Sequence, residues 1–487
     1  MASKFSGALQ LTDLDDFIAP SQECIKPTQI KKPSVVSLNK EIKKKSKIRL
    51  DDEGNYVDAA NEQIKTLQKA EVSLSDCLAC SGCVTSAESI LVQQHSFEEF
   101  YKVVLSNKSE NPKRYIVVST SPQSRASLSA HYGLSLEETA LFLSNFFTKI
   151  GANLVLDTAY FRQYVLDECR KEFIELFQNN ANLPILTSAC PGFICYAEKT
   201  HGKLVIPHLS KVKSPQQIAG SLIKSIIPSV SENSPSSVYH VTVMMCYDKK
   251  LEATREDFYN DIYRSKDVDL VLATTEVQTM IEKESISPKD LLSLDNHTTP
   301  DVSSIHKELR KALLAPSNLI SNAGGGSGGF LEYIFRSAAK ELFNKTVDKI
   351  EYKTIRNNKD FREVILNDDD GNVLLRFACT YGFRSIQNLV QKMKRKMCKY
   401  HYVEVMACPS GCLNGGGQIK DPKLSRDEQK EHLALIQKKY DEVEPQTELH
   451  DVPSLADKFS ASDLDMILYT KYHALETDNA IGLGIKW

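Results

Sequence analysis

Short apolar runs alternate with helix-like stretches from about residue 112 onward, and this alternation limits the possible folds. The runs RYIVVST, ANLVLDTAY and LPILTSACP have the length and β-branched content of strands, whereas SLEETALFLSNFFTKIG has helical periodicity. The pattern resumes with VYHVTVMMC, DLVLATT, GNVLLRFACTYGF and HYVEVMACPSGC. Strands that alternate with helices are typical of layered α/β folds. The sequence therefore predicts an α/β body.

Cysteines stand where several of these apolar runs end. Cys190, Cys246 and Cys408 each follow such a run, and Cys412 lies close behind Cys408. Open α/β sheets place their sites in the crevice beyond the carboxyl ends of the strands, where loops from different strands meet. We therefore expect these cysteines, although far apart in sequence, to share one site.

Length and charge exclude several classes of function. A chain of 487 residues is long enough for roughly three domains and needs no metal merely to stay folded. Its net charge of −3 gives no general attraction to nucleic acid or to an anionic membrane, so neither is an expected partner. No apolar run approaches the length of a membrane span, and the start lacks a secretion signal. We expect a soluble intracellular protein, in which the 12 cysteines stay reduced rather than form disulfides.

A cysteine triplet near the N-terminus predicts a metal cluster. Cys77, Cys80 and Cys83 are separated by two-residue gaps, which let a turning backbone present three thiolates to one cubane. Cys24 is the only other N-terminal candidate for the fourth ligand, because the fourth cysteine and proline of bacterial ferredoxins are absent. Zinc is the alternative, but a four-cysteine zinc site more often uses two separated pairs. We favour an iron–sulfur cluster.

These features divide the chain into three parts. Residues 1–110 form an N-terminal cluster-binding segment, residues 111–420 the α/β domain, and residues 421–487 a C-terminal helical extension and tail.

Four segments of the chain resemble a known family. They are Thr187-Ser-Ala-Cys190-Pro-Gly, Ser214-Pro-Gln-Gln217, Met244-Met-Cys246-Tyr-Asp-Lys-Lys-Leu-Glu252 and Met406-Ala-Cys408-Pro-Ser-Gly-Cys412-Leu-Asn-Gly-Gly-Gly-Gln418. In this order they resemble segments of the iron-only hydrogenases, over residues 112 to 420. The resemblance implies a two-lobed body with a cubane in the crevice between the lobes. Its implied ligands are Cys190, Cys246, Cys408 and Cys412, the last of which bridges to a two-iron subcluster in the enzymes.

Some positions match the enzymes and others depart from them. Lys249 takes the place of a lysine that hydrogen-bonds a cyanide of the subcluster, although it also reads as a solvated lysine at a helix end. Ala189 stands where the enzymes have a proton-relaying thiol, and a methyl group carries no proton. Ser410 replaces a usual glycine and is expected to crowd the cluster loop. Gly415 to Gly417 would let the backbone approach inorganic sulfide closely.

The N-terminal pattern, the missing relay and the length are similar to the eukaryotic iron-only hydrogenase-like proteins, also called nuclear prelamin A recognition factor-like. This resemblance implies an assembly factor without hydrogenase activity, with two 4Fe-4S clusters, in the cytosol; the nucleus stays open as a second location. Its implied partners are an early scaffold ATPase complex and a late targeting complex that contains a WD40 propeller protein and a HEAT-repeat protein. The alternatives are a hydrogenase-type redox enzyme with a two-iron subcluster and a zinc-binding interaction protein.

The C-terminal residues suggest a recognition tail. Trp487 is the only tryptophan of the chain and its last residue. Ile485-Lys486-Trp487 resembles the hydrophobic–acidic–aromatic tripeptide that recruits proteins to the targeting complex, with Lys486 as a departure. A terminal indole and carboxylate are suited to joint capture by an apolar pocket and basic groups or backbone donors. The alternative is a tail that folds back on the core.

Overall fold

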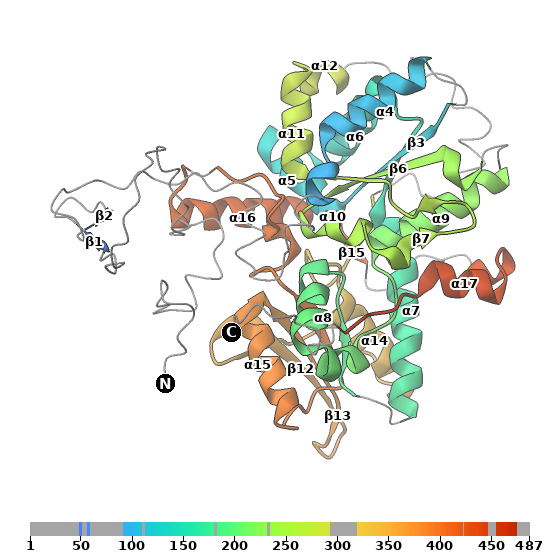
Figure 1. Ribbon diagram of the computed structural model, residues 1–487. Helices are drawn as coiled ribbons and strands as arrows, with labels where there is room; N and C mark the ends of the chain where they lie inside the picture. The colour runs from blue at the N-terminus through green and yellow to red at the C-terminus, as the bar shows by residue number, and fades with distance from the viewer. Residues whose placement is uncertain are drawn as a thin grey trace, which may run out of the picture. The chain divides into compact units, whose positions relative to one another are not determined.

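The structure is a computed structural model that describes residues 48–50, 56–58, 91–109, 113–179, 183–230, 234–292, 319–421, 423–446 and 454–474. The chain divides into two compact units. The smaller one consists of Leu11–Val84, and the larger one consists of Met1–Gln10 and Thr85–Trp487. In the smaller unit, the described strands β1 (Ile48–Leu50) and β2 (Tyr56–Asp58) pair antiparallel. All the elements below belong to the larger unit (Figure 1).

A four-stranded parallel sheet with its helices makes the first lobe of the larger unit. The strand order is β4-β3-β6-β9, and every residue of β6 and β9 is buried, as expected for a parallel sheet covered on both faces. One apolar cluster joins this sheet to α4, α6 and α11. The bounds are β3 (Tyr115–Thr120), β4 (Leu154–Asp157), β6 (Val238–Met244), β9 (Leu270–Ala273), α4 (Phe97–Ser109), α5 (Pro122–Tyr132), α6 (Leu136–Ile150), α11 (Thr274–Lys283) and α12 (Pro288–Leu292).

The second lobe is built on a five-stranded mixed sheet of order β11-β12-β13-β14-β5. The β11, β12 and β13 strands pair antiparallel, whereas β13, β14 and β5 run parallel to one another. Its elements are β5 (Ile185–Thr187), β11 (Lys353–Ile355), β12 (Asn358–Asn367), β13 (Val373–Tyr381), β14 (Tyr402–Met406), α8 (Pro191–Val205), α14 (Phe330–Phe343) and α15 (Gly382–Lys394).

Two helices connect the lobes through a shared core. The long α7 (Thr158–Gln178) and α9 (Pro215–Val230) belong to one apolar cluster that includes Val117 of the first sheet and Phe377 of the second. The α7 helix also packs on α14 of the second lobe (Figure 1). The lobes therefore share buried apolar surface, which fixes the strand ends of both sheets relative to each other.

The helix ends show how local sequence sets these elements. Ser135 and Glu138 form a reciprocal capping box at the start of α6, where the Glu138 carboxylate accepts from the Ser135 backbone N–H at 2.7 Å. Pro122 occupies the first turn of α5, and Gly133 ends that helix with a φ of 68°. The α/β body predicted from the sequence is confirmed.

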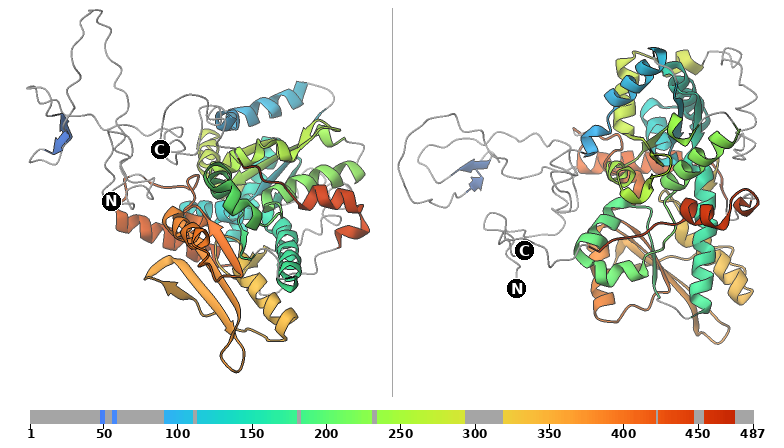
Figure 2. Two further views of the ribbon diagram at one scale, coloured as in Figure 1. Left: turned by 60° about the horizontal axis from the view of Figure 1, so that its bottom comes forward. Right: turned by 45° about the vertical axis from the view of Figure 1, so that its right-hand side comes forward.

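Two further helices, α16 (Arg426–Tyr440) and α17 (Ala461–Leu468), follow the second sheet. The α16 helix packs on α5, whereas α17 packs on α9, and the views in Figure 2 show the two well apart. Between the main elements lie α10 (Asp248–Ala253), β7 (Tyr259–Asn260), β8 (Ser265–Lys266), β10 (Ser321–Asn322), β15 (Pro445–Gln446) and the 3-10 turns η1 (Ile206–His208), η2 (Pro235–Ser237), η3 (Glu256–Phe258), η5 (Cys412–Asn414) and η6 (Leu455–Asp457). Within the described ranges, no helix is long and apolar enough to cross a membrane.

Candidate metal centre

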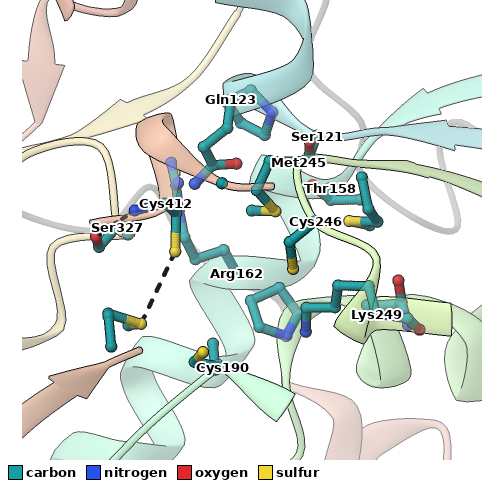
Figure 3. Close-up of a pocket in the computed structure, with 18 of the residues that line it drawn as sticks. Ser121, Gln123, Thr158, Arg162, Cys190, Met245, Cys246, Lys249, Ser327 and Cys412 are labelled. Atoms are coloured by element: carbon teal, nitrogen blue, oxygen red, sulfur yellow. Dashed lines mark hydrogen bonds between the residues drawn. The ribbon is translucent and has the colours of Figure 1, made fainter. Parts of the chain in front are cut away.

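Cysteines from both lobes line one cavity. Cys246 follows β6 of the first lobe, Cys190 follows β5, and Cys408 follows β14 of the second. Together with Cys412 at the start of η5, all three line the same cavity. Figure 3 shows the sulfur atoms of Cys190, Cys246 and Cys412 around a common space. The structure thus brings together the four cysteines that the sequence grouped.

Backbone hydrogen bonds fix Cys190 against the second sheet. The Ser188 hydroxyl donates to the Val405 carbonyl at 2.6 Å and accepts from the Cys190 N–H at 3.2 Å. The Ala407 N–H points at the Cys190 sulfur at 3.4 Å. Because Ala407 directly precedes Cys408, this contact holds two of the four cysteine loops in register.

The glycines after Cys412 pack on the Cys246 loop. A Cβ at Gly415 would lie 2.3 Å from the Met245 carbonyl oxygen, and one at Gly417 would lie 3.2 Å from the Cys246 nitrogen. The Gly417 N–H donates to the Met245 carbonyl at 2.9 Å. These glycines therefore allow a close backbone-to-backbone approach between the lobes.

A glycine-rich loop, residues 324–329, supports Cys412. The Ser327 hydroxyl accepts from the Cys412 N–H at 3.1 Å, and a Cβ at Gly411 would lie 2.3 Å from the same oxygen. A Cβ at Gly326 would collide with Leu413. No pattern in the sequence of this segment points to Cys412, because the two are far apart along the chain.

Burial makes the four thiols poor acids in the absence of a metal. Desolvation raises the pKa of Cys412 to about 12, raises that of Cys190, and holds those of Cys246 and Cys408 well above the usual range. The carboxylate of Asp248 opposes the ionisation of three of them, all but Cys412. Any metal group bound here must therefore displace thiol protons.

The donor set fits a cluster better than a single ion. Across the described part of the chain, no three His, Cys, Asp or Glu side chains are placed to share one metal ion. A cubane does not require its ligands to converge on one point, because each thiolate binds a different iron. Thiolate ligands without imidazole or carboxylate in the set select iron–sulfur clusters or zinc. Four cysteines spread around one cavity thus match a cubane.

Lys249 lies inside this site and is not solvated. Its side chain is 5% exposed, and its ammonium donates to Glu252 at 2.8 Å and to the Ser214 hydroxyl at 3.2 Å. The side-chain amide of Gln216 donates to the same Glu252 oxygen at 3.0 Å. The interpretation of Lys249 as a solvated helix-end lysine is wrong, because a buried carboxylate holds it against the cavity.

The two departures from the enzymes have different consequences. Ala189 lines the cavity, so a methyl group occupies the position next to Cys190. Ser410 is exposed and does not crowd the cluster loop, so that expectation is wrong. Its φ of 61° lies in the left-handed region, and its N–H donates to Asp360 at 2.8 Å. The serine affects the backbone of this turn rather than the space inside the cavity.

The remaining predicted site residues fall elsewhere. Cys24, Cys77, Cys80, Cys83 and Trp487 lie outside the residues that the structure describes. The N-terminal cluster and the recognition tail therefore stay predictions.

The fold is that of the iron-only hydrogenases. The family model described as iron only hydrogenase large subunit, C-terminal domain, matches residues 114–416. A single-residue variant of the FeFe-hydrogenase HydA1 of Chlamydomonas reinhardtii superposes with a TM-score of 0.63 at 22% identity, over 78% of this chain and 98% of that one. A HydA structure described as revealing stepwise assembly of the H-cluster gives 0.63 at 23% identity, over 78% and 99%. At such identities the likeness concerns the fold.

Relatives of full length are more similar. The cytosolic Fe-S cluster assembly factor narfl of Xenopus tropicalis is 49% identical over 100% of both chains. The cytosolic iron-sulfur assembly component 3 of Mus musculus is 49% identical, again over 100% of both. A probable cytosolic Fe-S cluster assembly factor of Culex quinquefasciatus is 43% identical over the same shares. The chain belongs to this family of cytosolic iron–sulfur assembly factors, which carry an iron-only hydrogenase-like domain.

Proposed function

We propose that this chain is a component of the cytosolic iron–sulfur protein assembly machinery and holds two 4Fe-4S clusters. Cys190, Cys246, Cys408 and Cys412 would hold one cluster in the cavity between the lobes. The observation that carries this proposal is their convergence on one cavity, in a chain whose full-length relatives are named as assembly factors. The N-terminal triplet with Cys24 would hold the other.

The two clusters would differ in how they are held. When bound, a cubane supplies one-electron redox chemistry and a rigid tie between its ligand loops. At the cavity, Ala407 donates a hydrogen bond to the Cys190 sulfur and Ser327 holds the Cys412 backbone. Buried ligands with such support retain a cluster well. The N-terminal set uses three cysteines from one short segment, and we propose that its cluster is the more exchangeable one.

Hydrogenase activity is not part of this proposal. The relay position before Cys190 is Ala189, and an alanine side chain neither donates nor accepts a proton. The buried Lys249 beside Cys246 favours the alternative, a redox enzyme with a two-iron subcluster. Infrared spectra decide between them, because only a two-iron centre carries metal-bound carbon monoxide and cyanide. We expect no such bands, and their presence would establish the alternative.

The chain is expected to act between two larger assemblies in the cytosol, and the nucleus stays open as a second location. The proposed early partner is a scaffold ATPase complex, and the late partner is a targeting complex that contains a WD40 propeller protein and a HEAT-repeat protein. Trp487 would provide the contact with the late complex. Deleting Trp487 should abolish co-purification of the targeting complex while leaving the iron content unchanged. Undiminished co-purification would remove the tail from the proposal.

A cellular experiment tests the assembly role. Cells depleted of the protein should lose the activity of a cytosolic iron–sulfur enzyme while a mitochondrial one stays active. The wild-type chain should restore activity, whereas Cys246→Ala should not. As a matched control, Cys379→Ala removes a buried thiol that does not line the cavity, and it should restore activity. Full rescue by Cys246→Ala would contradict the proposed role of the cavity.

A further inference from the structure

A buried arginine lies against the cavity of the four cysteines. Arg162 belongs to α7, is 3% exposed and lines the same cavity (Figure 3). A Cβ on Gly328 would lie 3.5 Å from its Cδ, so the glycine-rich loop that supports Cys412 covers the arginine directly. The guanidinium therefore has little access to water.

The hydrogen-bond partners of this guanidinium are neutral. The Nε donates to the Asn322 side-chain oxygen at 2.9 Å and the Nη1 donates to the Tyr440 hydroxyl at 3.1 Å. The Nη2 is buried without a hydrogen-bond partner, and among the described residues Arg162 makes no ion pair. Its buried neighbour Arg125 differs, because it pairs with the carboxylate of Asp157. One positive charge thus stays unmatched next to the cavity.

A buried charge without a counter-charge is unfavourable, so an anion is expected nearby. Lys249, the other buried cation at the cavity, is already matched by Glu252. A cubane bound by four thiolates is itself anionic, because the thiolates outweigh the positive iron–sulfur core. The negative charge of such a cluster would balance the unmatched positive charge of Arg162.

We propose that Arg162 is the counter-charge of the cluster held by Cys190, Cys246, Cys408 and Cys412, and that it raises the reduction potential of that cluster. The inference rests on the proposed function, since it requires a cluster at these cysteines. Reduction adds negative charge, and a fixed cation in a desolvated site favours the reduced form. Arg162 would act through space, without ligating iron.

Two variants remove the charge in different ways. Arg162→Gln deletes it. Asn322→Asp keeps the arginine but puts a carboxylate where the guanidinium now meets an amide oxygen, so the charge is neutralised locally. In both variants the midpoint potential should become more negative. Arg162→Lys keeps the charge and should shift the potential less, and Tyr440→Phe removes only a neutral hydrogen bond and should leave it unchanged.

The measurement is an anaerobic redox titration of the full chain, followed by electron paramagnetic resonance. The signal of the cavity cluster is the one that persists in Cys80→Ala. Wild-type protein without iron and sulfide at the cavity would refute the proposed function itself. An intact cluster with wild-type potential in both Arg162→Gln and Asn322→Asp would overturn only the inference. Should Arg162→Gln fail to fold, Asn322→Asp alone decides.

Discussion

The two lobes contribute unequally to the cavity. The first lobe, a fully parallel sheet, supplies only Cys246, whereas the mixed sheet of the second supplies Cys190, Cys408 and Cys412. Three of the proposed ligands therefore belong to one lobe, and Cys246 is the only one that the first lobe adds. The four cysteines are therefore not equivalent: through a bound cluster Cys246 would join the lobes, whereas the other three all lie on the second lobe.

The largest effect is expected from Cys246→Ala. This change removes the one proposed ligand that comes from the first lobe and leaves a vacant cluster site, so the free energy of unfolding should fall by at least about 3 kcal/mol. Thermal unfolding and iron content on anaerobically purified protein measure it. Cys379→Ala, a buried thiol of the second lobe away from the cavity, is the control. Equal melting temperatures for the two variants would mean that a cluster in the cavity does not stabilise the two lobes against unfolding.

Acid should weaken the first lobe in particular. Burial lowers the pKa of His95 and of His240 from 6.5 to about 3. Below pH 6.5 the unfolded chain therefore binds protons that the folded chain does not, so stability present above pH 6.5 is lost as the pH falls toward 3. Each histidine contributes about 1.4 kcal/mol per pH unit in that window.

Urea unfolding at pH 7.5 and pH 5.5 checks this expectation. In His240→Gln the stability should depend less on pH than in the wild type, although its stability at pH 7.5 should also be lower because the imidazole contacts Ser119 at 2.9 Å. If the free energy of unfolding falls as much between pH 7.5 and pH 5.5 in His240→Gln as in the wild type, His240 does not cause the acid sensitivity.

A smaller effect is expected in the second lobe from Ser327→Ala. The change removes the acceptor of the Cys412 N–H, which should cost about 1–2 kcal/mol and speed the loss of iron to a chelator. Ser385→Ala is the control, because this serine is buried in the same lobe and accepts a hydrogen bond from Asn358 away from the cavity. Iron loss at the same rate in both variants would exclude a specific role for Ser327.

Ser410→Gly should have a small stabilising effect. Glycine adopts the φ of 61° without the penalty of a Cβ, so stability should rise by about 0.5–1 kcal/mol. Ser285→Gly relieves a similar φ of 54° in the first lobe and should give a similar gain. Calorimetry measures both. A loss of stability in Ser410→Gly alone would mean that the serine hydroxyl has a role at the loop.

No effect on the body is expected from Cys80→Ala. The variant should lose the N-terminal cluster while the α/β body keeps its melting temperature, because all four cavity cysteines lie in the larger unit. Global unfolding by circular dichroism would contradict the independence of the two cysteine sets.

The sequence predicted the α/β body and the grouping of four cysteines, because apolar periodicity and strand-end placement are local signals. It did not predict the burial of Lys249, which depends on Glu252 and Ser214 closing around it. Nor did it identify Ser327 or Arg162, since both act through contacts with residues far away in the chain. Ser410 was misjudged because exposure is a property of the folded loop.

Metal analysis of the anaerobically purified chain shows whether it holds two independent 4Fe-4S clusters. We expect about eight iron and about eight acid-labile sulfide per chain, falling to about four of each when Cys77→Ala and Cys80→Ala are combined. Iron well above this would support the two-iron enzyme centre. Zinc in place of iron, or a double variant with unchanged iron and sulfide, would contradict this expectation.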